Sequence, residues 1–269
     1  MVVAVFRHRS GFVASLVLAF VLLLAAFGPW LAPYDPYDSS FDALSGSTLP
    51  HPLGTDYLGR DVLSRLLHGS TLSLFGAVQV VLIGGFFGII PGILSVFLGR
   101  AFEWTTLRLI DTLVALPSLV FAVAVTALIG NGISEAMLAV GILVAPLFYR
   151  VSRAACLEVT AQPYVQASML MGGSVAWIVR KHVWSKILPS IAIAGANITG
   201  HALIVISSLT FLGIGVQPPI PTWGGLLASD LLYLAQQPFA PLFPSVLIVG
   251  TVAALNLLAD AIRDVQPHS

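Results

Sequence analysis

Six apolar runs that are almost free of charge divide the chain. A helix rises about 1.5 Å per residue, so about 20 apolar residues cross a hydrocarbon layer roughly 30 Å thick. The pattern therefore predicts six transmembrane helices, of which the fourth is short and contains Pro146. Their expected ranges are 11–31, 72–97, 107–129, 134–149, 191–212 and 242–258.

A seventh run, 159–180, is also nearly free of charge but does not read as a membrane helix. It carries Thr160 and Gln162, and Gly172 with Gly173 divides it. Neither half is long enough to cross a bilayer with its backbone groups satisfied. We therefore expect this segment to lie in the connection between the fourth and fifth spans.

The connection carries start and stop signals for two short helices. Pro163 suits a first helical turn and Gly172 suits the position after the last turn, which predicts a helix from about 163 to 171. Ser174 is placed to cap a second helix that runs toward Trp184, and Pro189 is expected to reset the chain before the fifth span.

The composition supports a membrane protein. Hydrophobic residues make up 57% of the 269 residues, charged residues only 9%, and the mean hydropathy is +0.95. The expected fold is all-α, a polytopic bundle of six transmembrane helices with an inner two-helix loop. The expected divisions are 1–32, a stub with the first span; 33–70, an outer loop; 71–264, the main transmembrane domain with its inner loop at about 150–189; and 265–269, a tail.

Basic residues orient the bundle. Six spans place both termini on one side, and ten of the twelve Lys and Arg residues fall on that side, leaving only Arg60 and Arg65 opposite. Because basic loops stay inside, we expect a multi-pass membrane protein with both termini in the cytoplasm.

Several function classes lack their chemistry in this sequence. The formal net charge is zero, which argues against nucleic acid as a partner. The only two lysines, Lys181 and Lys186, do not stand in a phosphate-binding loop, so we expect no ATP hydrolysis by this chain alone. We find no zinc-protease motif and expect no metal site, no cofactor and no catalytic residue in this chain.

Small and polar residues within the spans are read as packing groups. Gly84, Gly88 and Gly92 repeat every four residues and predict a stripe for close helix contact. Asp111 and Asp260 lie near helix ends, where they snorkel to the interface or pair with a nearby arginine. His201 and Asn256 lie deeper, and either bond another helix or line a pathway. The sequence shows no broken helix at the middle of the membrane.

The inner loop resembles the coupling loop of bacterial ABC importer permeases. The match rests on spacing and residue type, although Gln166 stands where that family has Glu, and Ser168 stands where it has Ala. The resemblance implies that the loop docks on a cytosolic ATPase; packing on the chain's own helix ends is the alternative. The residues concerned are Tyr164, Val165, Gln166, Ala167, Ser168, Gly172, Ile178, His182 and Pro189.

Two outer segments resemble the C-type permeases of dipeptide and oligopeptide importers more narrowly. They are 51–65 (HPLGTDYLGRDVLSR) and 208–219 (SLTFLGIGVQPP) with 221–224 (PTWG). The ending 257–264 also fits, but Thr71 stands where that family has Arg. We expect these outer segments to contact the binding protein or form an outer gate. The residues are Asp56, Arg60, Asp61, Gln217, Pro218, Pro219 and Trp223.

The resemblance implies a permease subunit of an ATP-driven importer. Its implied partners are a second permease, two cytosolic ATPases that hold ATP and magnesium, and an extracytoplasmic binding protein that delivers di- or oligopeptides, or a nickel complex. A stand-alone carrier or channel is the first alternative, and it predicts activity without ATPases. An intramembrane enzyme is the second, but Ser207, Ser208 and His201 on one helix do not form a catalytic triad.

Overall fold

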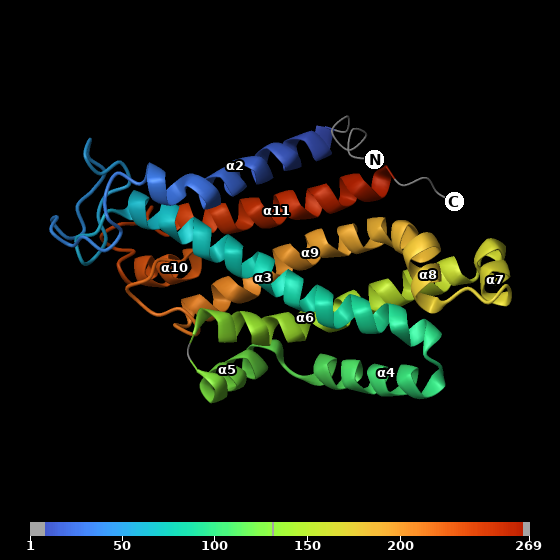
Figure 1. Cartoon of the computed structure of the whole chain (residues 1–269). Helices are drawn as coiled ribbons and strands as arrows, with labels where there is room; N and C mark the ends of the chain where they lie inside the picture. Colours follow the sequence, from blue (N-terminus) through green and yellow to red (C-terminus); the bar gives the residue numbers. More distant parts are fainter. Residues whose placement is uncertain (1–8, 131, 266–269) are drawn as a thin grey trace.

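The computed structural model describes residues 9–130 and 132–265, which form helices and loops without a named strand. Five of the described helices are long and apolar enough to cross a membrane, and the number is six if the bent pair of α4 and α5 counts as one span. The fold is a polytopic helical bundle, as expected (Figure 1). The helices are α2 (Arg9–Leu31), α3 (Val62–Phe97), α4 (Arg100–Ala115), α5 (Ser118–Ile129), α6 (Ile133–Thr160), α7 (Pro163–Leu170), α8 (Val175–Ile178), a π-helical turn η1 (Val179–Val183), α9 (Trp184–Phe211), α10 (Trp223–Leu232) and α11 (Leu242–Asp264).

The third span is broken, which the apolar pattern did not predict. The axes of α4 and α5 differ by 97°, and the chain turns at Leu116 and Pro117. Proline disfavours a helical conformation in the preceding residue, and Leu116 is extended, with ψ of 131°. The expected continuous span 107–129 is therefore interrupted, and that expectation was wrong.

The inner connection is shorter than expected because the flanking helices are longer. Helix α6 continues through Arg150 to Thr160, and α8, η1 and α9 follow one another without a gap from Val175 to Phe211. Pro189 lies inside α9 and does not separate two helices, so that expectation was wrong. Helix α3 likewise begins at Val62, ten residues before the expected start of the second span.

Helices α3 and α6 form the centre of the bundle, and the predicted glycine stripe lies between them. A Cβ atom at Gly88 would meet the Ala145 carbonyl and would lie 2.6 Å from the Phe148 Cβ. Gly84 and Gly92 face α6 in the same way. The three glycines therefore lie where α3 and α6 approach each other closely.

One end of the bundle carries the start of α2, the end of α11 and the inner loop α7–α8, and the opposite end carries the segments before α3 and around α10 (Figure 1). We name this opposite end the outer cap, residues 32–65 and 212–241. The expected N-terminal stub before residue 9 and the tail 266–269 lie outside the described residues.

Polar residues near the helix ends behave as expected. Asp111 lies 3.7 Å from Arg150, and Asp260 lies 3.1 Å from Arg263. The two deeper residues, His201 and Asn256, are exposed on the surface of this chain and have no side-chain hydrogen bond among the described residues. They do not join helices within the described bundle.

Candidate functional site

The inner loop is anchored to the chain's own helices by one side of α7. Pro163 occupies the first turn, where its missing N–H leaves no hydrogen bond unmade. Val165 is fully buried and packs in a hydrophobic cluster with Ile93 of α3, Cys156 of α6 and Ile178 of α8. An eight-residue helix is too short to be stable alone, so this cluster holds it in place.

The predicted turn after α7 is present. Gly172 has φ of +82°, in the left-handed region that residues with a Cβ rarely adopt. The Gly172 N–H donates to the Met169 carbonyl, and the Gly173 N–H donates to the Ser168 carbonyl at 3.0 Å. The glycine pair therefore closes the helix and returns the chain toward α8.

His182 connects the two parts of the loop. Its Nε2 lies 3.3 Å from the Ser168 hydroxyl, and its ring packs beside Tyr164 and edge-on to Trp177. The Ser174 hydroxyl accepts from the Trp177 N–H at 3.4 Å, as a helix cap. The structure thus brings the sequence-predicted residues of this loop together, apart from Pro189, which lies further along α9.

The other side of the inner loop is apolar and exposed. Leu170 is 89% exposed and Met171 is 80% exposed, and Tyr164 and Trp177 are each 45% exposed. Gln166 is also exposed, and its amide donates only to the Ala161 carbonyl, at 3.3 Å. Packing on the chain's own helices therefore accounts for Val165, but not for this outward face.

The outer cap holds a buried ionic cluster. The Asp56 carboxylate accepts from the Arg60 Nε and lies 2.7 Å from its Nη2, and it lies 3.4 Å from the Arg65 Nε. Arg65 also donates to the carbonyls of Pro36 and Pro219, which come from two separate outer segments. The three charged side chains are each 6% exposed or less, so this cluster seals the cap from within.

A second buried carboxylate begins α3. Asp61 caps the helix by accepting from the Ser64 N–H at 2.7 Å, and its other oxygen lies 2.9 Å from the His51 Nδ1. Because Asp61 is fully buried, it acts inside the cap. Asp56, Arg60 and Asp61 therefore do not form an exposed docking surface on this chain.

Trp223, expected to contact the binding protein or to form an outer gate, is fully buried. Its backbone N–H donates to the Ser73 hydroxyl at 3.0 Å, and its indole N–H donates to the Ser70 hydroxyl at 3.2 Å. The tryptophan thus fastens α10 to α3. Of the outer residues named from the sequence, Gln217, Pro218 and Pro219 are exposed.

Asp230 in α10 is a buried acidic residue that the sequence analysis did not single out. It is 8% exposed, and its Oδ2 has no hydrogen-bond partner among the described residues. Burial and the nearby Asp56 carboxylate raise the pKa of Asp230 to about 7, although Arg65 opposes the shift. No local sequence pattern indicates this, because the neighbouring charges come from distant parts of the chain.

The outer cap and the inner loop both fall within the part of the chain that is similar to known proteins. Residues 84–267 match the family described as the binding-protein-dependent transport system inner membrane component. The chain belongs to this family. Residues 3–50 match the N-terminal transmembrane domain of oligopeptide transport permease C.

The chain matches curated relatives over almost its whole length. It is 35% identical to the di/tripeptide transport system permease protein DppC of Pseudomonas aeruginosa over 267 residues, which cover 96% of this chain and 88% of the relative. It is 34% identical to the glutathione transport system permease protein GsiD of Escherichia coli O157:H7 and of Shigella boydii, over 96% of this chain and 86% of each relative. The chain is thus a membrane component of binding-protein-dependent transport and not the catalytic subunit.

Proposed function

We propose that this permease carries short peptides into the cytoplasm as one subunit of an ATP-driven importer. A second permease completes the membrane part, and two cytosolic ATPases, with ATP and magnesium, supply the energy. An extracytoplasmic binding protein delivers the cargo. Relatives that are named as di/tripeptide and glutathione transport permeases support a peptide as cargo over a nickel complex.

The observation that carries this proposal is the exposed apolar face of the inner loop. Leu170 and Met171 are two large apolar side chains that face outward, and they lie beside the turn at Gly172. A short helix with an exposed apolar face suits a groove on another protein. We assign that groove to the ATPase, because Val165 already fixes the opposite side of α7 to the bundle.

Orientation follows from the same assignment. The inner loop shares its end of the bundle with the start of α2 and the end of α11 (Figure 1). Ten of the twelve basic residues are assigned to this side by the chain's order of spans. We therefore place this end in the cytoplasm.

A stand-alone carrier is not favoured. The broken span at Leu116 and Pro117 is a feature that carriers also have. It does not account for the exposed inner face or for membership in a binding-protein-dependent family.

The deciding experiment is gentle extraction of the tagged chain at native expression, followed by mass identification and an ATPase assay of the proteins that co-purify. We expect a second permease and ATPases. In the variant Gln166→Arg we expect less ATPase to be recovered, because a longer cationic side chain would occupy the exposed docking face. Gln217→Arg, an exposed substitution in the outer cap, is the matched control. A homo-oligomer without ATPase activity would contradict the proposal.

A further inference from the structure

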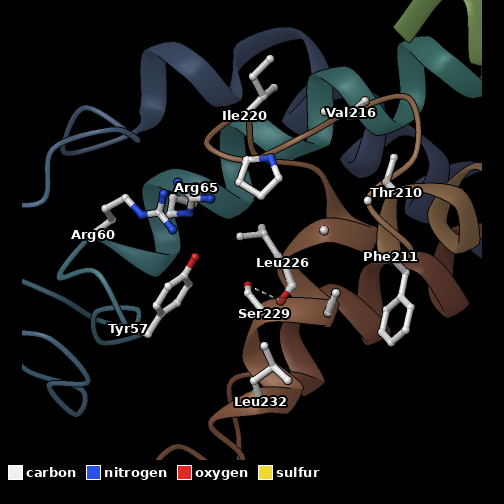
Figure 2. Close-up of a pocket in the computed structure, with 14 residues that line it drawn as sticks. Tyr57, Arg60, Arg65, Thr210, Phe211, Val216, Ile220, Leu226, Ser229 and Leu232 are labelled. Atoms are coloured by element: carbon white, nitrogen blue, oxygen red, sulfur yellow. Dashed lines mark hydrogen bonds between the residues drawn. The ribbon is translucent and has the colours of Figure 1, made fainter. Parts of the chain in front are cut away.

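The outer cap contains a cavity of about 220 Å³ between α10, the end of α9 and the loop that precedes α3. Figure 2 shows Arg60 and Arg65 side by side at one end of it, with the Tyr57 hydroxyl directed toward the same end. The opposite walls are apolar and include Leu226 and Phe211 (Figure 2). The cavity therefore has one cationic end and one apolar end.

The cationic end has hydrogen-bond donors to spare. Arg60 uses its Nε and Nη2 for Asp56, which leaves its Nη1. Arg65 uses its Nη1 for two carbonyls, which leaves its Nη2. The Tyr57 hydroxyl has no hydrogen bond among the described residues, and its ring is held by stacking on Tyr233 at 5.0 Å.

The charges around the cavity also favour an anion. Asp56 supplies one full negative charge to the two guanidinium groups. Asp230 lies close enough to interact with Asp56 and Arg65, but its pKa of about 7 leaves much of it uncharged near neutral pH. Asp230 is also outside the set of residues that line the cavity. The cluster thus keeps a positive excess, and a guanidinium pairs well with a carboxylate.

We propose that this cavity binds the last residue of a short peptide, with its terminal carboxylate at the arginine end and its side chain against the apolar walls. The proposal rests on the proposed peptide cargo and names the part of the peptide that the permease itself recognises. A volume of about 220 Å³ is below the usual range of whole-ligand pockets, which suits one residue and not a complete peptide.

The test measures equilibrium binding of a radiolabelled Ala-Phe dipeptide to the full transporter, purified with its co-purifying subunits in lipid nanodiscs and without the binding protein. We expect saturable binding of the acid. The same dipeptide with an amidated C-terminus should bind at least about tenfold more weakly than the acid, because the amide loses a charge-assisted contact. N-acetyl-phenylalanine should compete, since it keeps the carboxylate and the apolar ring. Equal binding of acid and amide would overturn the proposal.

Two variants locate the site. Tyr57→Phe keeps the stacked ring and removes only the hydroxyl, so it should weaken the acid several-fold and leave the amide unchanged. Phe211→Ala should weaken Ala-Phe more than Ala-Gly, because it removes part of the apolar wall. Arg263→Gln, at the other end of the bundle, is the control and should have no effect. Unchanged selectivity in both site variants would place the binding elsewhere and overturn the proposal.

This test is separate from that of the proposed function. A preparation that contains the second permease and an active ATPase, but does not distinguish acid from amide, sinks the cavity assignment alone.

Discussion

The inner loop and the outer cap treat their functional residues in opposite ways. In the outer cap, Asp56, Arg60 and Arg65 form an ionic cluster whose side chains are almost completely buried. In the inner loop, Val165 is buried but Leu170 and Met171 project from the bundle. The charged motif residues of the cap are therefore held inside this chain, whereas those of the loop leave one face for another protein.

The largest effect should come from breaking the buried ion pair of the cap. Arg60→Gln leaves Asp56 with only the more distant Arg65, and removing one partner of a buried ion pair costs up to about 3 to 5 kcal/mol. We expect a large fall in the thermal midpoint of the detergent-solubilised protein. Arg263→Gln removes an exposed pair, for which about 0 to 1 kcal/mol is expected. Similar losses in the two variants would show that burial of the cap is unimportant.

The contact between α3 and α6 should respond next. Gly88→Ala drives a Cβ into the Ala145 carbonyl, and overpacking of this kind costs about 1 to 3 kcal/mol. Its measure is again the thermal midpoint. Gly250→Ala in α11 is the control, because nothing lies within 4 Å of its added Cβ. The close-packing interpretation fails if both variants melt together.

The turn of the inner loop gives a smaller effect on stability but a larger one on function. Gly172→Val forces a β-branched residue into a left-handed conformation, at about 1 to 2 kcal/mol. Nothing lies within 4 Å of the added Cβ, so the penalty is conformational and local. We expect normal folding of the bundle with loss of ATP-driven uptake and of ATPase recovery. Gly195→Ala, in open space on α9, should leave uptake intact. Normal uptake by Gly172→Val would contradict the turn model.

The smallest expected effect is the pH dependence of the outer cap. The pKa of Asp230 is raised to about 7, so its contribution to stability is fully present in acid and is lost as pH rises through that value. From pH 6 to 8 the loss is about 1.4 kcal/mol for this one group. The charged groups that surround it are Asp56 from the loop before α3 and Arg65 from α3 itself.

Asp230→Asn tests this assignment, because an amide of the same shape does not titrate. Thermal midpoints measured from pH 6 to 8 should fall with pH in the unaltered protein and should be flatter in the variant. Asp264→Asn, beyond the cap at the inner end, should keep the original slope. If Asp230→Asn keeps that slope as well, the pH dependence comes from another group.

Sequence patterns predicted the features that depend on neighbouring residues. The six apolar segments, the glycine stripe of α3 and the turn at Gly172 all follow from local spacing and backbone preference. The break between α4 and α5 was missed because the apolar run is continuous, although Pro117 was a local signal for it. A proline is therefore informative even where hydropathy is uniform.

Features that depend on distant residues were not predictable in this way. Trp223 lies beside a proline-rich segment and reads as a surface residue, but its hydrogen-bond partners Ser70 and Ser73 are about 150 positions away. The high pKa of Asp230 likewise depends on Asp56, on a separate segment. Burial of these side chains is set by how α10 closes on α3, which local spacing does not contain.

The unbroken course of α8, η1 and α9 has a mechanical consequence. From Val175 to Phe211 the backbone is helical without a gap over 37 residues, which corresponds to a helical rise of about 55 Å. Its inner end carries Trp177, and near its outer end Ser207 abuts Gly224 of α10. We therefore expect a tilt of the inner end to move α10 in the outer cap. The π-helical turn η1 lies near the inner end, and because long helices bend at such turns, we expect this helix to bend there.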